Sequence, residues 1–144
     1  MEYKIKHLKT SDYDQLIRLW KRAGLPYRPS GRDSVRAMAE EFSRAETCIL
    51  GMYNDDRLIG SVIGTSDGRK GWINRLAIDP EYRGQGLAGI LITSAENFLQ
   101  GFGIQVMATL IEEENLPSIS SFKKAGYIYS PGICYFSKRS SVDD

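Results

Sequence analysis

Apolar and polar residues change their spacing along this chain, and the changes predict alternating strands and helices. Alternation over residues 3–7 predicts a strand. Spacings of three and four residues then predict a helix, with Thr10 or Ser11 as its N-cap and Gly24 as its end. Helical spacing returns over residues 33–44. The residues expected on the buried faces of these two helices are Tyr13, Leu16, Ile17 and Trp20, and then Val35, Met38, Ala39 and Phe42.

The rest of the chain continues this mixture of elements. Two apolar runs joined by a turn predict a hairpin, and a long apolar stretch after a glycine pair predicts a helix that buries Leu87, Ile90, Leu91 and Phe98. The expected strands are 47–53, 58–65, 71–79, 104–111, 127–129 and 133–137, and the expected helices are 86–102 and 117–125. This order predicts an α+β domain, or an α/β domain of three-layer type, with a central mixed sheet.

The bulk properties limit the classes of function. The 144 residues fit one domain, which we place at residues 1–139, with a frayed tail at 140–144. A net charge of +1 gives no electrostatic case for binding nucleic acid or an anionic membrane. No signal peptide or membrane-spanning stretch is visible, so we expect a cytoplasmic protein. Cys48 and Cys134 are expected to be buried free thiols, and no metal pattern is present.

The segment richest in chemistry is Arg83-Gly84-Gln85-Gly86-Leu87-Ala88, between an expected strand and a long expected helix. Two glycines allow a phosphate to approach the backbone, and the unpaired amides of a helix start attract anions. A tight turn with a surface arginine would use the same six residues. The segment is neither a P-loop, because no Gly-Lys-Ser/Thr follows, nor a dinucleotide fingerprint, because G-x-G-x-x-G is absent.

The surrounding sequence resembles the GNAT superfamily of N-acetyltransferases. Residues 76–88 match that family's strand and its R/Q-x-x-G-x-G/A loop. A second family signature follows in the expected place, as Asn115 and then residues 122–127, Phe-Lys-Lys-Ala-Gly-Tyr. The order of elements agrees over nearly the whole chain.

The resemblance implies an enzyme that transfers an acetyl group from acetyl-CoA to a primary amine by direct attack in a ternary complex. It also implies a mostly antiparallel sheet whose two parallel strands splay to form the CoA cleft. In this family the strand residues Leu76, Ala77 and Ile78 would hold the pantetheine arm, and the Leu76 amide would face the thioester oxygen. The same three residues could equally form an ordinary core strand. The residues implied at the pyrophosphate and along the arm are Arg83, Gly84, Gln85, Gly86, Leu87, Ala88, Asn115, Ser118 and Phe122.

The chain departs from the family at both stereotyped catalytic side chains. Trp72 and Asn74 stand where a glutamate base is frequent, and Phe122 stands where a tyrosine acid is usual. A water held by Asn74 could act as base while the thiolate leaves unaided. Other side chains could substitute, namely Glu112, Glu113 or Glu114 as base and Tyr82, Tyr129 or Tyr135 as hydroxyl donor. A third hypothesis is a non-catalytic acyl-CoA-binding regulatory module.

The acceptor cannot be read from the sequence. It could be a small molecule, a peptide or a protein, selected mainly by residues 20–36, where Arg22, Tyr27, Arg28, Arg32 and Asp33 lie. These arginines could attract an acidic acceptor or simply form a solvated loop. The oligomeric state is open, with a homodimer as one option.

Overall fold

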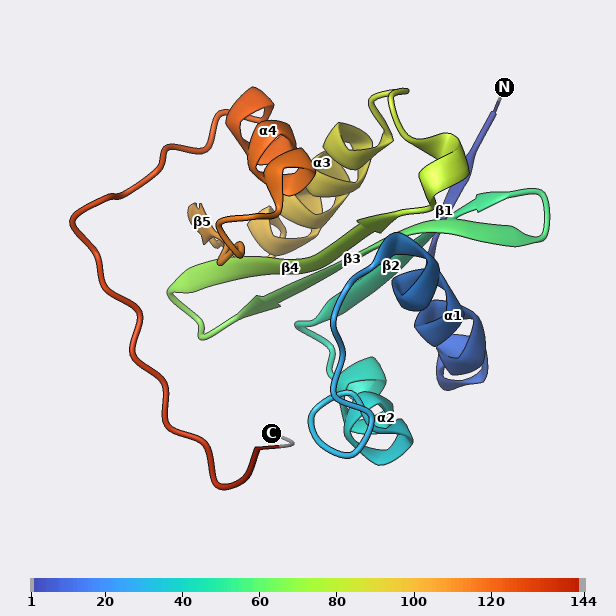
Figure 1. The fold of residues 1–144 in the computed structure, drawn as a ribbon, viewed down its shortest axis with the longest axis horizontal. Coiled ribbons are helices and arrows are strands. Elements are labelled where there is room, and N and C mark those ends of the chain that lie inside the picture. The colour runs from blue at the N-terminus through green and yellow to red at the C-terminus, as the bar shows by residue number, and fades with distance from the viewer. Residues whose placement is uncertain (1, 143–144) are drawn as a thin grey trace.

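The computed structural model describes residues 2–142 and shows a five-stranded sheet with helices on both faces (Figure 1). The strands lie in the order β1-β2-β3-β4-β5. The first four are antiparallel neighbours, and β5 runs parallel to β4. This is the mixed, mostly antiparallel sheet that was predicted. The strands are β1 (Lys4–His7), β2 (Cys48–Asn54), β3 (Arg57–Ser66), β4 (Lys70–Ile78) and β5 (Val106–Ala108).

The helices form the two outer layers. In Figure 1, α3 and α4 cover one face of the sheet, and α1 and α2 cover the other. Each face has its own apolar core, one centred on Leu91 and Ile92 of α3 and the other on Leu16 and Trp20 of α1. The bounds are α1 (Tyr13–Ala23), α2 (Val35–Ser43), α3 (Leu87–Gln100) and α4 (Leu116–Lys124).

Three local predictions about the helices are wrong. Thr10 and Ser11 do not cap α1, because both lie in a short 3-10 turn, η1 (Thr10–Asp12), held by Asp12, whose carboxylate accepts from the Lys9 amide at 2.8 Å. Val35 is 58% exposed at the first turn of α2, and Ile90 is 49% exposed on α3. The exposure of Ile90 has a reason, because this residue borders the cleft described below.

The C-terminal part of the chain also differs from the prediction. The described residues 125–142 form neither helix nor strand, so the strands expected at 127–129 and 133–137 are absent, and the strand expected at 104–111 is only three residues long. A strand is stable only when a neighbour accepts its backbone hydrogen bonds. The segment after α4 runs outward past β5 without pairing with it and turns back toward α2 (Figure 1).

Three further expectations concern cysteines, membranes and metals. Cys48 is buried as predicted, but Cys134 is exposed, so the prediction for Cys134 is wrong. None of the described helices is long and apolar enough to cross a bilayer. Within residues 2–142, no three His, Cys, Asp or Glu side chains gather as a metal ion would require. The cytoplasmic location and the domain limits at residues 139 and 140 stay predictions, and Met1 and residues 143–144 lie outside the described residues.

Candidate functional site

The site begins where β4 and β5 part. The two strands are paired over Lys70–Trp72 and Val106–Ala108, and within the described chain they do not pair further along β4. A cleft of about 810 Å³ lies along the second half of β4, between α3 and α4. That volume is in the range of pockets that bind small molecules and cofactors. The splayed parallel strands implied by the family resemblance are therefore present.

A bulge separates the two halves of β4. Ile63 of β3 lies opposite Asn74 and Ser61 lies opposite Ala77, so two steps along β3 match three steps along β4. Arg75 takes up the extra residue with φ at 55°, a left-handed conformation that is uncommon for residues other than glycine.

The bulge changes which side chains face which layer. Before it, Ile73 packs into the core under α3, and Asn74 lies opposite Ile63, which belongs to the core under α1. After it, Leu76 packs on the α3 side and Ala77 on the α1 side. Without the extra residue, alternation would place position 75, and not position 76, on the α3 side. The bulge thus turns Leu76 toward the cleft.

A buried network holds the bulge in place. The Trp20 indole donates to the Ser61 hydroxyl at 3.1 Å, and that hydroxyl donates to the Arg75 carbonyl at 3.1 Å. The Arg75 guanidinium bonds Asp33 at 2.5 Å, also donates to the Pro26 carbonyl, and lies 4.9 Å from the centroid of the Trp20 ring. Burial lowers the pKa of the Arg75 guanidinium, and the Asp33 carboxylate opposes that shift.

A second buried carboxylate fixes the end of β4. Asp79 is 1% exposed and accepts from the Glu81 amide at 3.0 Å, from Arg22 at 3.0 Å and from Arg57 at 3.1 Å. Burial alone would raise the pKa of the Asp79 carboxyl, but the Glu81 amide and Arg22 more than offset it, and the pKa is lowered. Asp79 thereby anchors the 3-10 turn η2 (Pro80–Tyr82), which leads into the glycine loop.

The glycine loop delivers backbone amides to the cleft. Gly84 and Gly86 have φ of 82° and 76°, and Gly86 is the N-cap of α3. The space beside both glycines is open, since an added Cβ would meet no atom within 4 Å. The first-turn amides of α3 therefore combine with two backbone positions that have no side chain, which is the geometry that the predicted anion site requires.

Arg83 acts first as a tether in this structure. Its guanidinium donates to the Ile78 carbonyl at 3.2 Å and to the Ala23 carbonyl at 3.0 Å. The arginine therefore ties the glycine loop to the end of β4 and to α1, while its side chain still borders the cleft. Ile78 is one of the residues that the resemblance assigned to the pantetheine arm, and its carbonyl already has this partner.

Most of the residues predicted for the cofactor line one cleft. Those that do are Leu76, Ile78, Arg83, Gly84, Gly86, Leu87, Ala88 and Ser118. The remaining four do not line it. Ala77 packs on the opposite face of the sheet, and the Gln85 side chain accepts from the Tyr3 hydroxyl at 2.8 Å. Asn115 caps α4 by accepting from the Ser118 amide at 3.3 Å, and Phe122 is buried.

Several lining residues were missed, among them Thr93, Ser94, Glu96, Ser121 and Lys124. A signal for Glu96 was available, because it is the one charged residue of α3. Glu96 accepts from the Tyr127 hydroxyl at 2.8 Å, and Tyr127 stacks edge-on against Phe122, with ring centroids 5.0 Å apart. Burial and then the Glu96 contact raise the pKa of the Tyr127 hydroxyl, so it stays protonated and fastens α4 to α3.

The candidates for acid–base work are unevenly placed. Asn74 lies on the α1 side of the sheet, next to the bulge. Tyr82 lines the cleft, and its hydroxyl accepts from the Asn54 amide nitrogen at 2.9 Å, which leaves its own proton available for donation. Residues 112–114 do not line the cleft, and Tyr129 and Tyr135 lie in the exposed C-terminal segment.

The chain matches known proteins over most of its length. The model of the Acetyltransferase (GNAT) family matches residues 12–127. The chain belongs to the GNAT family. An acetyltransferase of Sodalis glossinidius (strain morsitans) is 27% identical over 140 residues, which are 94% of each protein.

Solved structures show the same GNAT fold. The PaiA N-acetyltransferase of Thermoplasma acidophilum, in complex with coenzyme A, gives a TM-score of 0.75 at 21% identity, covering 86% of this chain and 88% of that one. AAC(6')-Iy, bound to the bisubstrate analogue CoA-S-monomethyl-acetylneamine, gives a TM-score of 0.79 at 17% identity, covering 96% of this chain and 99% of that one. The aminoglycoside 6'-N-acetyltransferase AAC(6')-IG of Acinetobacter haemolyticus gives a TM-score of 0.77 at 19% identity, covering 96% of this chain and 99% of that one.

These matches confirm the family and the fold class predicted from residues 76–88 and 122–127. The chain is an enzyme of the acetyl-CoA-dependent N-acetyltransferase class. The neighbouring structures are too distant in sequence to identify its acceptor.

Proposed function

We propose that this GNAT enzyme transfers an acetyl group from acetyl-CoA to a primary amine by direct attack within a ternary complex. The observation that carries the proposal is the continuity of the cleft. The unpaired half of β4 leads directly to the amides of the glycine loop at the start of α3. One extended ligand with a pyrophosphate near its middle and a thioester at its end matches this arrangement.

The chemistry of the lining residues fits acetyl-CoA. The amides from Gln85 to Ala88 would hold the pyrophosphate, and Lys124 at the end of α4 supplies a positive charge on the opposite wall. Leu76 would place its amide against the thioester oxygen, where negative charge develops as the acyl group is attacked. Bound acetyl-CoA supplies an activated acyl group, and the protein supplies its orientation.

The acceptor amine must lose a proton before or during transfer. We assign this proton to a water held by Asn74, which lies beside the bulge on the face of the sheet opposite α3, so the amine would approach from the α1 side. The thiol of CoA is acidic enough to leave as thiolate, and Tyr82, which lines the cleft and has a phenolic hydroxyl, could protonate it. Phe122, buried at 3% exposure, would support the wall and not transfer protons.

Direct attack has a kinetic test. Neither cysteine lines the cleft, so no thiol in it is available to carry the acyl group. Initial rates measured over both substrates, with a panel of acidic, neutral and polycationic amines, should give intersecting double-reciprocal lines. Parallel lines would show an acyl-enzyme and contradict direct attack. Absence of turnover with every amine, alongside normal CoA binding, would favour the acyl-CoA-binding regulatory module.

The role of Asn74 has its own test. Asn74→Ala should lower kcat about tenfold and leave the KM for acetyl-CoA nearly unchanged, since a positioned proton acceptor contributes to the chemical step. Asn97→Ala is the matched control, because Asn97 is exposed on α3 outside the cleft. Equal activity of the two variants would remove Asn74 from the mechanism.

A further inference from the structure

Half-buried side chains lie on the α1 face of the sheet, beside the bulge. Gly71 and Ile73 face α3, so alternation places Trp72 on the α1 face, where it lies opposite Thr65 of β3. Trp72 is half-buried and belongs to neither apolar core of the described chain. We call Thr65, Trp72 and Asn74 the floor. An aromatic ring that packs in neither core leaves an apolar face for a ligand.

The loop that joins α1 to α2 crosses β4 beside this floor (Figure 1). Arg75 reaches the loop twice, because its guanidinium donates to the Pro26 carbonyl and to the Asp33 carboxylate. The same carboxylate accepts from the Arg28 amide at 2.7 Å, and the Arg28 carbonyl accepts from the Asp33 amide at 3.0 Å. The turn over residues 28–33 is therefore fixed against the bulge, next to the floor.

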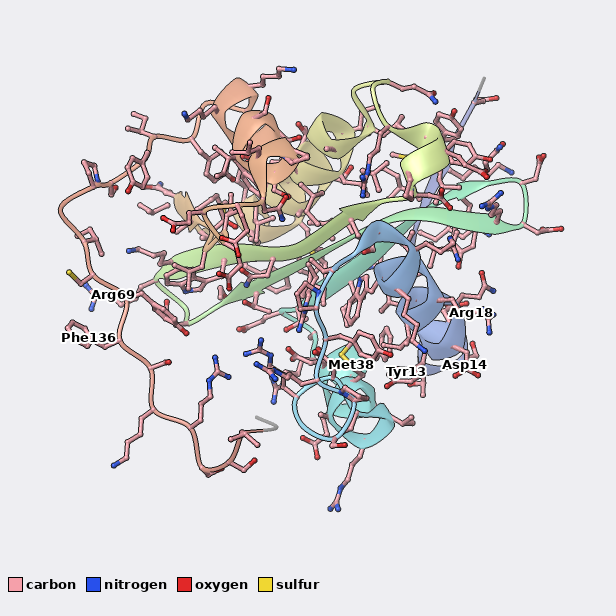
Figure 2. All side chains as sticks on the ribbon, viewed as in Figure 1. Tyr13, Asp14, Arg18, Met38, Arg69 and Phe136 are labelled. Atoms are coloured by element: carbon pink, nitrogen blue, oxygen red, sulfur yellow. The ribbon has the colours of Figure 1, made fainter. Side chains whose placement is uncertain are left out.

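Positive charge is concentrated in the two segments that frame the floor. Residues 26–34 and 66–75 contain five arginines and lysines and two aspartates, a net charge of +3. Because the whole chain has a net charge of +1, the rest of it carries −2. Figure 2 shows Arg69 at the turn between β3 and β4, at the opposite end of the floor from the loop. At that end the Lys70 ammonium lies 5.6 Å from the centroid of the Trp72 ring.

The two aspartates of these segments have other partners. Asp33 is 4% exposed and pairs with Arg75. Asp67 accepts from two backbone amides of its own turn, at 2.9 and 2.8 Å. Within residues 2–142, neither Arg28 nor Arg32 forms an ion pair with a carboxylate. The positive charge of these two side chains is therefore available to a ligand.

The guanidinium groups of the loop lie near that of Arg75. Burial lowers the pKa of the Arg75 guanidinium, and the positive charges of Arg32 and Arg28 add to that lowering. Both loop side chains are exposed. Arg28 also donates to the Val142 carbonyl at 3.4 Å, a contact that neutralises no charge. The planar fork of an arginine matches a carboxylate or a phosphate, with which it forms paired hydrogen bonds.

We propose that the acceptor is a small primary amine carrying a carboxylate or phosphate group, which Arg28 and Arg32 bind while the rest of the molecule lies on Trp72. This inference rests on the proposed function and on approach of the amine from the α1 side. The nitrogen–carbon bond forms as the carbon–sulfur bond breaks, the amine proton passes to the water held by Asn74, and CoA leaves as the thiolate. The anionic group is unchanged by the reaction. Polycationic amines would be repelled by the same charges.

Amines that differ mainly in charge test the proposal. Phosphoethanolamine is compared with ethanolamine, and β-alanine with β-alaninamide, so that the two pairs separate phosphate from carboxylate. In at least one pair the anionic member should have a kcat/KM at least tenfold higher than its partner, and spermidine should be poorer than either. Equal values within both pairs, or a preference for the neutral amines or for spermidine, would overturn the anionic acceptor and leave acetyl transfer itself intact.

A double variant tests the two arginines. Arg28→Gln with Arg32→Gln should lower kcat/KM for the anionic amine at least tenfold, mainly through KM, and leave the neutral partner unchanged. Both side chains are exposed and the Arg28 amide that binds Asp33 is kept, so the fold should be retained. Arg44→Gln, at the end of α2, is the control for the loss of an exposed positive charge and should change neither value. Equal losses for both amines would reveal a structural role and overturn the assignment.

Binding measured without turnover separates this inference from the proposed function. Each amine is titrated calorimetrically into the wild type saturated with CoA, which cannot transfer an acetyl group. The anionic member of a pair should bind at least tenfold more tightly than its neutral partner, and the double variant should lose that difference. Such a preference in an enzyme that acetylates none of the amines would support the anion site and contradict acetyl transfer. Without a preference within either pair, the anion site is refuted whether or not acetyl transfer occurs.

Discussion

The two halves of β4 are held in opposite ways. Lys70–Trp72 is an ordinary strand segment with backbone partners on both sides, β3 and β5. Beyond the bulge, β4 keeps β3 but has lost β5, and it is supported by Trp20 of α1, Ser61 of β3 and Asp33 of the loop before α2. The difference shows how a strand can keep backbone groups free for a ligand and still be held in a fixed conformation. The hydrogen bonds that it lacks along one edge are replaced by buried polar contacts on one face.

The largest effect is expected from breaking the ion pair behind the bulge. Arg75→Met should lower the free energy of unfolding by about 3 kcal/mol, because it leaves the Asp33 carboxylate buried without its guanidinium. The matched control is Arg44→Met, which removes the exposed pair with Glu41 and should cost less than about 1 kcal/mol. Urea denaturation measures both. Similar losses for the two variants would mean that the pair behind the bulge has no special weight.

The second-largest effect is expected on CoA binding, from a substitution in the glycine loop. Gly86→Ala should raise the Kd for CoA roughly 30-fold, about 2 kcal/mol, because a methyl group would occupy the open space where the phosphates approach. Gly68→Ala is the control, since Gly68 also has positive φ and open surroundings but lies in the turn before β4, outside the cleft. Both variants carry similar backbone strain. Calorimetric titration with CoA separates strain from blocked binding, and equal Kd values would show that the phosphates bind elsewhere.

The third-largest effect is expected from removing the Ser61 hydroxyl, which joins Trp20 to the bulge. Ser61→Ala should cost about 1–2 kcal/mol of stability and lower kcat, because the Arg75 carbonyl and the Trp20 indole lose a buried partner. Ser66→Ala, opposite Gly71 in the paired half, should change neither quantity appreciably. The KM for acetyl-CoA should change less than kcat in Ser61→Ala. A variant with intact kcat and reduced stability would show that the network supports the fold alone.

The smallest effect concerns the buried thiol of Cys48 in β2 at alkaline pH. Cys48 lies opposite Gly64, and burial raises the pKa of its thiol to about 11. The folded state thus favours the neutral thiol, and that contribution is complete below the ordinary pKa of 9.0 and is lost as the pH rises toward 11. Between pH 8 and 10 the wild type should lose roughly 1 kcal/mol more stability than Cys48→Ala. Parallel pH profiles of the two proteins would refute this assignment. A thiol reagent should label Cys134 at once and Cys48 only on unfolding.

The sequence predicted those parts of the site whose causes are local. Gly84 and Gly86 mark the loop because their conformations need glycine, and the apolar run after them marks α3. The bulge could not be predicted in this way, because no neighbouring residue in the sequence requires Arg75 to adopt a positive φ. Its partners Asp33 and Ser61 lie 42 and 14 residues away along the chain, so tertiary contacts alone specify it.

The prediction of strands at residues 127–129 and 133–137 failed for a related reason. These residues have the composition of strands, and local composition was all that the prediction used. A strand exists only beside a neighbour, and within the described chain these residues have none.

The change of alternation at the bulge has an evolutionary consequence. Trp72 and Asn74 lie on the opposite face of β4 from Leu76 and Ile78, although all four belong to one strand. On the proposal that the amine approaches from the α1 side, a substitution at the first pair would reshape the acceptor site without altering the backbone or the side chains that border the cleft. Descendants of this chain could therefore exchange one amine for another while inheriting the same donor. Selection could tune the two preferences separately within a segment of seven residues, 72–78.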